Sequence, residues 1–195
     1  MYGFPNSLCI SPNEEVVHGI PNDKPLKEGD VLSEDCGVYM NDFYGDHAYS
    51  FEVGEVAPKT KKLLKITKES LYKGIEQCVR GKRVGDISFA IQNYCEKEGY
   101  GVVRDFIGHG IGPTIHESPA VPHYGEAGKG LRLKEGMVIT IEPMINTGTW
   151  KMKMDPNGWT SYTLDGGISC QYEHSIAITY EVPILLTSQG EEGPY

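Results

Sequence analysis

The sequence predicts a two-layer α+β fold in which two similar halves share one central site. The first observation is an internal repeat: residues 26–35 read LKEGDVLSED and residues 133–142 read LKEGMVITIE. A second repeated pair, HGIP at 18–21 and HGIG at 109–112, precedes the two copies. The third observation is the order of expected elements, which is strands, two amphipathic helices and strands again. A high content of Gly and Pro, 24 and 12 residues, favours many turns over a helix bundle.

The first strands are expected to form a β-hairpin. Residues 29–40 alternate in polarity, as a strand with two different faces does. Turn-forming residues occupy 41–46, and 47–54 again has a strand-like composition. The hairpin therefore carries Asp35 on one arm and Asp46 near the start of the other.

Two consecutive amphipathic segments supply the helical layer. The first runs over 58–80, where Pro58 opens the helix and Gly81 ends it. The second is expected at 86–98, with Asp86 as its N-cap and one apolar stripe.

Strands return in the second half of the chain, around a Gly- and His-rich run at 105–124. They are expected at 101–104, 136–146, 158–166 and 168–180. The end of the chain, 188–195, is expected to fray. No low-complexity linker divides the sequence, so residues 1–195 are expected to form a single domain.

The composition excludes several classes of function. The net charge of −9 argues against nucleic-acid binding, so no direct sequence-specific nucleic-acid contact is expected. The apolar runs are too short to span a membrane, and the N-terminus lacks the pattern of a signal peptide. Five Cys residues without a CxxC pair suit a reducing compartment better than a disulfide framework. We therefore expect a cytoplasmic protein.

Five ionisable side chains stand in expected strands or in the Gly-rich run: Asp35, Asp46, His109, Glu142 and Glu173. Each one alone could be a turn residue, a strand end or a solvated His. However, the repeat places Asp35 and Glu142 at equivalent positions. A buried carboxylate must be paired, protonated or bound to a metal. Two divalent ions would balance four carboxylates, and such ligands suit Mn, Fe, Co or Zn in a site for hydrolysis.

Four segments resemble the type I methionine aminopeptidases, which are metallopeptidases of the pita-bread fold. They are DCGVYMNDFYGDHAYSF (35–51), GHGIGPTIHESP (108–119), TIEPMIN (140–146) and QYEHSIAIT (171–179). Prolidases share the GHGIG motif, whereas EPM and YEH point to the methionine enzymes. The resemblance covers essentially the whole chain. It implies a pseudo-two-fold symmetric, curved antiparallel sheet with helices on its outer face.

The resemblance also implies a role for each matching residue. The five candidate ligands would hold two divalent metal ions, with Asp46 and Glu173 bridging them. Glu142 would also shuttle a proton. His18 and His116 would bind the scissile peptide and stabilise the charge that develops on it.

Further matches concern the substrate side chain and a third ion. The apolar pocket for methionine would be lined by Phe4, Cys9, Ile115 and Trp159. A monovalent cation would lie at Asn13, Glu15 and Ser169.

Two features depart from the family pattern. The chain begins at about the level of the family's pocket loop, so we expect an N-terminally truncated domain without the usual helix pair and strand. Glu34 replaces an aliphatic residue on the face opposite Asp35, aligned with Ile141 of the second copy. Without a helical cover, this face would expose the apolar side chains of Leu32, Cys36 and Val38. Such a patch predicts self-association or marginal stability.

The resemblance implies an enzyme that removes the initiator methionine from nascent proteins and peptides when the second residue is small. Its partners would be peptide or nascent-protein N-termini, and the ribosome surface is a further candidate. The alternative is a non-catalytic or impaired module that binds peptides or a partner protein, because of the truncation. A prolidase-like peptidase is disfavoured by Met144, which follows Glu142–Pro143 where Gly is expected.

Overall fold

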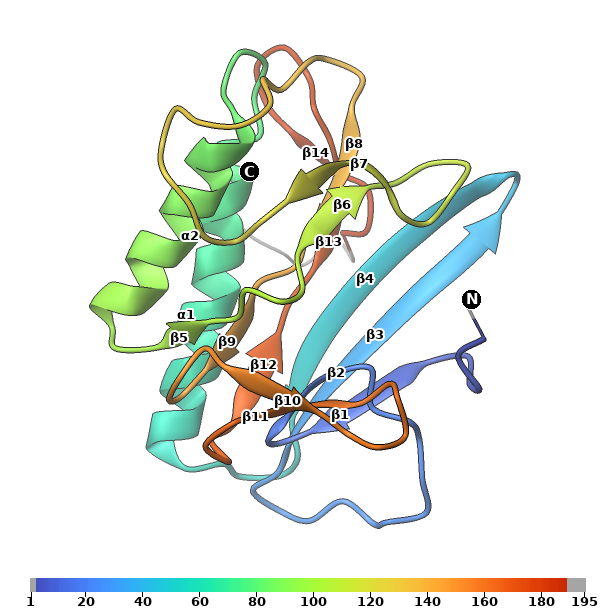
Figure 1. The fold of residues 1–195 in the computed structure, drawn as a ribbon, viewed down its shortest axis with the longest axis vertical. Helices are drawn as coiled ribbons and strands as arrows, with labels where there is room; N and C mark the ends of the chain where they lie inside the picture. Colours follow the sequence, from blue (N-terminus) through green and yellow to red (C-terminus); the bar gives the residue numbers. More distant parts are fainter. Residues whose placement is uncertain (1–2, 189–195) are drawn as a thin grey trace.

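The computed structural model describes residues 3–188 and has two layers, with both helices on the same side of the strands (Figure 1). The helices are α1 (Pro58–Ile75) and α2 (Val84–Lys97). Strands precede and follow this helix pair in the chain, so the predicted order of elements is confirmed. The expected fraying of 188–195 lies outside the described residues, apart from Ser188. No described helix has both the length and the apolar character that a membrane span requires.

The strands are short, except for one hairpin. In chain order they are β1 (Cys9–Pro12), β2 (Glu15–Val17), β3 (Val31–Met40), β4 (Phe43–Glu52), β5 (Gly101–Val102), β6 (Gly108–Gly110), β7 (Glu117–Val121), β8 (Val138–Ile141), β9 (Met144–Asn146), β10 (Met152–Met154), β11 (Ser161–Thr163), β12 (Ser169–Gln171), β13 (His174–Ala177) and β14 (Ile184–Leu185). They form sheets in the orders β1-β3-β4, β10-β11-β2, β12-β9-β5 and β14-β13-β8-β6-β7.

The β3–β4 hairpin is longer than the sequence indicated. Asn41 and Asp42 have φ angles of 52° and 66°, as a tight two-residue turn requires. The turn predicted at 41–46 is therefore too long, because Phe43 already pairs with Met40. Asp35 and Asp46 lie on the two arms, as expected.

Both long strands predicted in the second half are interrupted. The segment 136–146 is divided into β8 and β9 at Glu142–Pro143, where Pro143 has no N–H for a ladder bond. The segment 168–180 is divided into β12 and β13 at Tyr172–Glu173. Two of the candidate ligands, Glu142 and Glu173, therefore lie outside the regular strands.

The Gly- and His-rich run contains two strands that the sequence did not predict, β6 and β7. A Cβ on Gly108 would lie 2.4 Å from the Thr140 carbonyl oxygen, and one on Gly110 would lie 2.3 Å from that of Ser118. Glycine is therefore required on both sides of His109, so that neighbouring backbones can approach closely.

The helix boundaries shift by a few residues. α1 ends at Ile75 and not at residue 80, since 76–80 form turns that keep Cys78 buried. α2 begins at Val84, with Arg83 as its N-cap. Asp86 lies inside the first turn and accepts the Arg83 N–H at 2.8 Å, so it caps the helix from the third position.

The main core fills the space between the helices and the strands of both halves. Its largest fully buried members include Leu63, Leu71, Ile75, Ile87, Ile91, Ile139, Ile141, Ile145, Ile176 and Ile178. A Cβ on Gly74 would lie 2.8 Å from Ile91 Cδ1, so this glycine allows the two helices to pack closely.

The outer face of β3 only partly matches the expected exposed patch. Val38 is 53% exposed, but Leu32 is only 7% exposed and Cys36 is half-buried. The prediction for Leu32 is therefore wrong. In register, Leu32 lies between Pro12 of β1 and Phe51 of β4, so it belongs to the central strand of a three-stranded sheet. Glu34 is half-buried between Ile10 and Tyr49 on the same strands.

Candidate active site

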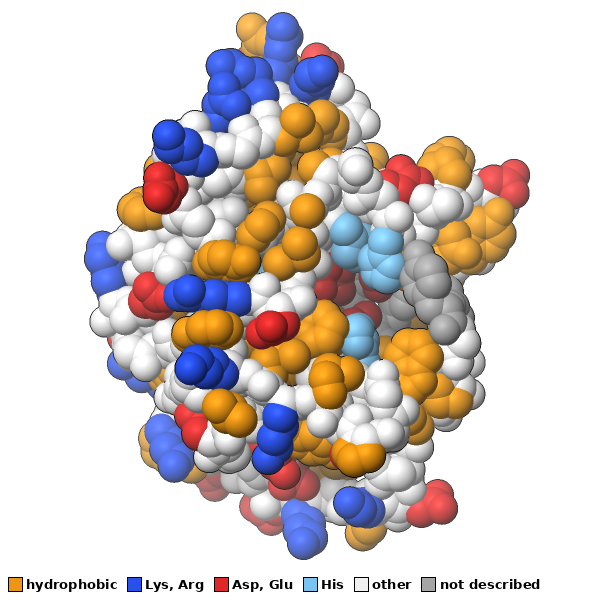
Figure 2. All heavy atoms as spheres, in the orientation of Figure 1, with side chains coloured by type: hydrophobic (Ala, Val, Ile, Leu, Met, Phe, Trp, Pro, Cys, Tyr) orange, Lys and Arg blue, Asp and Glu red, His pale blue; other side chains and the backbone are white. Residues whose placement is uncertain are grey.

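All five predicted metal ligands line one cleft between the two halves, with a volume of about 620 Å³. His18 and His116 line the same cleft. Figure 2 shows its mouth, where His side chains lie beside a recess of acidic atoms bordered by hydrophobic groups. Residues far apart in the sequence thus converge on one concave surface.

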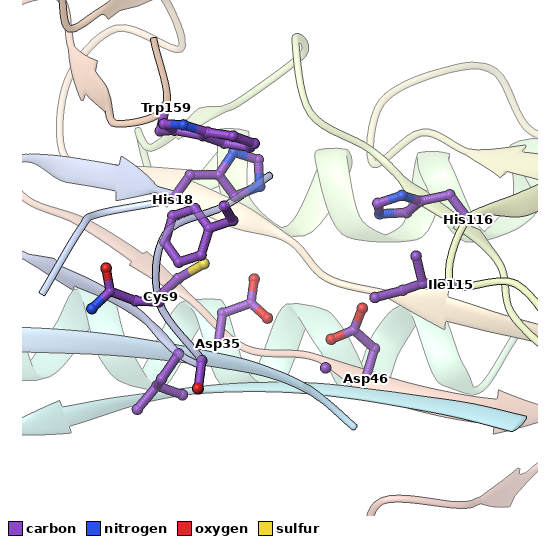
Figure 3. Close-up of a pocket in the computed structure, with 12 residues that line it drawn as sticks. Cys9, His18, Asp35, Asp46, Ile115, His116 and Trp159 are labelled. Carbon is purple, nitrogen blue, oxygen red and sulfur yellow. The ribbon is translucent and has the colours of Figure 1, made fainter. Parts of the chain in front are cut away.

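Backbone register places the two aspartates on the same face of the hairpin. Asp35 is paired with Ala48, and Gly37 with Asp46, so the two carboxylates are offset by two positions on adjacent strands. Figure 3 shows both side chains directed into the space between His18 and His116.

Glu142 and Glu173 come from the strand interruptions described above. Thr140 Oγ1 donates to Glu142 Oε1 at 2.9 Å, and His109 N–H donates to the same hydroxyl at 3.0 Å. Asp46, His109 and Glu173 each place a ligand atom within 4.8 Å of the others. His109 Nε2 lies 3.4 Å from Glu142 Oε1. The spacing is that of groups able to share a cation.

Burial makes this cluster of carboxylates electrostatically costly. Burial, and then the neighbouring Asp46, raise the pKa of Asp35 to about 8. Burial also raises the pKa of Asp46 to about 6 and those of Glu142 and Glu173 well above their ordinary value. No Lys or Arg lines the cleft in the described part of the chain. A positive charge is needed there for all four carboxylates to ionise.

The donor set fits divalent metal ions. Asp46 Oδ1 and Glu173 Oε1 are buried, and neither has a hydrogen-bond partner among residues 3–188. His109 Nδ1 donates to the Gly110 carbonyl at 3.0 Å, which leaves its Nε2 lone pair directed at the cluster. Burial lowers the pKa of His109 to about 4, so the ring is a neutral ligand. Carboxylates with one imidazole suit Mn, Fe, Co or Zn.

His18 and His116 face each other across the cleft (Figure 3). The His18 ring packs edge-on against Phe106 with centroids 5.0 Å apart, and its backbone has a φ of 57°. His116 packs edge-on against His109 with centroids 4.3 Å apart. Burial lowers the pKa of both His18 and His116, so both are neutral near pH 7.

The predicted substrate residues also come together. Phe4, Cys9, Ile115 and Trp159 line a smaller pocket of about 130 Å³, which shares His18, Asp35, Asp46 and His116 with the cleft. Phe4 packs edge-on against Trp159 with centroids 5.3 Å apart. Burial, and then Asp35, raise the pKa of the Cys9 thiol to about 12, so it is a protonated, weakly polar contact. Asn6, Ser7, Leu8 and Gly37 complete the lining and were not predicted.

The candidate monovalent site is only partly assembled. Ser169 N–H donates to the Asn13 carbonyl at 2.8 Å, so these two residues are adjacent. The Asn13 side chain, however, binds the Val31 N–H and Asp30. Glu15 Oε1 accepts from the Tyr162 hydroxyl. The monovalent cation therefore stays a prediction.

Sequence reasoning missed three residues that surround the ligands. Thr140 joins His109 to Glu142, Phe106 supports His18, and His123 Nε2 accepts the Glu142 N–H at 3.1 Å. Burial, and then His109, lower the pKa of His123 to about 3. The position of Thr140 two residues before Glu142, on the same strand face, was a usable signal. His123 gave none, because its partner is a backbone group 19 residues away.

Comparison with known proteins gives a consistent result. The model of metallopeptidase family M24 matches residues 1–180. The methionine aminopeptidase of Clostridium acetobutylicum is 50% identical over 186 residues, which cover 95% of this chain and 74% of that protein. Methionine aminopeptidase 1 of Bacillus subtilis is 49% identical, with 91% of this chain and 71% of that protein covered.

Solved structures agree with these relatives. The methionine aminopeptidase of Rickettsia prowazekii superposes with a TM-score of 0.94 at 47% identity, covering 96% of this chain and 76% of that one. A prolidase of Pyrococcus horikoshii reaches a TM-score of 0.73 at 27% identity and is covered over 49% of its length. The fold predicted from the sequence is confirmed. The chain belongs to metallopeptidase family M24 and, within that family, to the methionine aminopeptidases.

Proposed function

We propose that this chain removes the N-terminal methionine from peptides and nascent proteins whose second residue is small. The observation that carries the proposal is the shared wall of the two cavities. His18, Asp35, Asp46 and His116 line both the apolar pocket and the acidic cleft. A methionine side chain in the pocket would therefore hold the first peptide bond of its chain beside the candidate ligands. An unbranched thioether suits the aromatic rings and the thiol of this pocket.

Two divalent metal ions would be held by Asp35, Asp46, His109, Glu142 and Glu173. The raised carboxylate pKa values, the unpartnered buried oxygens and the neutral His109 support this assignment. When bound, the ions would supply Lewis-acid activation of the scissile carbonyl and of water.

The remaining steps are assigned to protein side chains. Glu142 Oε1 is oriented by the Thr140 hydroxyl, and its raised pKa suits a group that takes a proton from water and gives it to the departing amine. His18 and His116 are neutral imidazoles on either side of the cleft. Each would donate an N–H hydrogen bond to the scissile peptide as negative charge develops on its oxygen.

The test is release of free methionine from a Met-Ala-Ser peptide by purified protein, in chelator and then with Mn²⁺ or Co²⁺ added back. We expect release only with metal. Failure to release methionine at any metal concentration, with peptide binding intact, would favour the alternative of a non-catalytic module. No described feature of the site supports that alternative, because all five ligand positions and both imidazoles line the cleft.

We also propose that residues 1–195 act as one catalytic domain in the cytoplasm. The continuous core that joins both halves to α1 and α2 supports a single unit. The five thiols are free, which suits a reducing compartment.

We propose that the protein binds the ribosome surface and there contacts the N-termini of nascent chains. A basic surface supports this, formed by Arg80, Lys82, Arg83, Lys129, Arg132 and Lys134. Backbone bonds from Gly81 to Leu133 and from Leu133 to Lys82 order the two loops that carry it. Figure 2 shows Lys and Arg gathered at the end of the molecule where α1 connects to α2. Co-sedimentation with ribosomes at low and high salt tests the proposal, since electrostatic binding must weaken with salt.

Self-association is a separate proposal. The tip of the β3–β4 hairpin exposes Val38, Tyr39, Met40 and Phe43 by 53% to 67%. Apolar side chains grouped in this way favour association with a partner surface. Sedimentation velocity over a range of concentrations tests it, and a monomer at every concentration would contradict it.

A further inference from the structure

We infer that His123 is a positioning residue for Glu142, a role that rests on the proposed function. His123 has no exposed surface, and its Nε2 lies 3.1 Å from the backbone nitrogen of Glu142. The nitrogen is the donor, so His123 Nε2 must be unprotonated and accept. The ring proton of neutral His123 is then on Nδ1, which is buried and has no hydrogen-bond partner among residues 3–188.

The Glu142 N–H needs this acceptor because no strand supplies one. The ladder between β8 and β13 ends at the pair Ile141 and His174. Glu142 follows the last paired residue, and Pro143 comes next. A buried N–H without an acceptor would cost about 1–3 kcal/mol. His123 therefore stabilises the backbone at the point where the strand is interrupted and the carboxylate turns into the cleft.

The segment around His123 is fixed by its neighbours. The Ser88 hydroxyl of α2 donates to the Pro122 carbonyl, and the Gly125 N–H donates to Gln92 Oε1 of α2 at 2.9 Å. On the other side, Val121 is paired with Gly108, which directly precedes His109. His123 thus connects the helical layer to the backbone of Glu142, next to the strand that carries His109. Together with the Thr140 hydroxyl, which holds the carboxylate itself, it fixes both ends of the Glu142 residue.

Two substitutions separate this role from simple packing. His123→Phe keeps a planar ring but removes the acceptor. His123→Gln places a carbonyl oxygen near the position of Nε2 and keeps it. The matched control is Tyr124→Leu, since Tyr124 is the next residue and its ring packs against the Arg104 guanidinium, with 5.3 Å from Cζ to the ring centroid.

We expect His123→Phe to lower kcat about 10-fold or more with KM little changed, as is typical when a group that orients a metal ligand is lost. Titration of the metal-free protein with Mn²⁺ by calorimetry should show about 10–100-fold weaker binding of one equivalent. His123→Gln should recover most of both losses, and Tyr124→Leu should resemble the unsubstituted protein.

A folded His123→Phe protein with normal kcat and Mn²⁺ affinity would overturn the inference, and so would equal losses in the Phe and Gln variants. If the Phe variant does not fold, ¹⁵N NMR of the unsubstituted protein decides: protonation on Nδ1 supports the inference, and protonation on Nε2 overturns it. If the unsubstituted protein releases no methionine, the proposed function fails. The calorimetric and NMR results still test whether His123 positions Glu142.

Discussion

The Glu173 N–H donates a hydrogen bond to the Ala48 carbonyl, with 2.8 Å between the two atoms. Ala48 is two residues beyond Asp46 on β4, so this bond joins the two halves beside two candidate ligands. The Ser175 hydroxyl adds a second connection, because it accepts the Asp46 N–H and donates to the Asp46 carbonyl. Backbone bonds between the halves thus set the positions of Asp46 and Glu173, and the site is assembled by folding.

Asp46→Asn is expected to abolish metal-dependent hydrolysis while leaving the fold intact. The substitution removes a charge but preserves shape and the backbone bonds to Ser175. It also relieves repulsion in the buried cluster, so the melting temperature without metal should not fall. Peptide hydrolysis, metal stoichiometry and thermal melts measure these effects. Normal turnover with normal metal stoichiometry would contradict the assignment of Asp46 as a shared ligand.

His116→Ala should lower kcat by about 10²-fold or more while metal binding is retained, because one donor to the developing charge is lost. His116 packs against His109 edge-on, so metal content must be measured in the same samples. If metal content fell as steeply as activity, His116 would instead be a ligand.

Without metal, the protein is expected to lose stability as the pH rises. Asp35 has an ordinary pKa of 3.8 and a folded-state pKa of about 8, so the folded state holds its proton where the unfolded state has released it. The free energy of unfolding then decreases with pH between these two values. Asp46, Glu142 and Glu173 shift in the same direction.

Thermal melts in chelator from pH 6.5 to pH 8 measure this dependence. Below pH 6.5 the lowered pKa values of His18, His109, His116 and His123 act in the opposite direction, because the unfolded state binds protons there that the folded state does not. Asp30 and Asp165 do not contribute to the pH dependence in the measured range. Their pKa values are lowered from 3.8, so they change the free energy of unfolding only below about pH 4. Metal competes with these protons, so the stabilisation by saturating Mn²⁺ should grow with pH. A melting temperature in chelator that is constant over this range would argue against protonated carboxylates in the cleft.

Gly110→Ala should impair metal binding and stability. The new Cβ would lie 2.3 Å from the Ser118 carbonyl oxygen, which forces β6 away from β7 and moves the adjacent His109. The matched control is Gly45→Ala, next to Asp46, where a Cβ has no neighbour within 4 Å. Mn²⁺ titration and thermal melts of both variants provide the comparison, and equal behaviour would contradict the steric argument.

Peptides that begin Met-Ala should be cleaved far faster than those that begin Met-Leu. The Phe106 ring packs edge-on against His18 at the cleft, so a large second side chain would meet this pair of rings beside the scissile bond. Competition between the two peptides in one reaction gives the ratio of kcat/KM directly. Equal rates would show that this part of the cleft does not select the second residue.

Much of this arrangement could be predicted from the chain itself. The repeated strand identified Asp35 and Glu142 as equivalent, and periodicity located the hairpin and both helices, since these features depend on neighbouring residues. Their places in expected strands and in the Gly-rich run made Asp46, His109 and Glu173 candidate ligands, and the resemblance supplied the ligand roles and the four pocket residues. The pairing of β6 with β7, the burial of Leu32 and the His123 bond to Glu142 depend on close approaches between distant segments. Local sequence does not encode such approaches, although Gly108 and Gly110 permit them.

The wall shared by the pocket and the cleft links two equilibria. Any ligand that fills the apolar pocket contacts Asp35 and Asp46, and any ion in the cleft changes the charge on those same groups. Bound ions must therefore change the affinity for the methionine end of a peptide. The bound peptide must change the affinity for the ions by the same factor. The affinity of an inhibitor for the pocket will therefore depend on which metal is bound. An inhibitor selected with one metal will bind with a different affinity when another metal occupies the cleft.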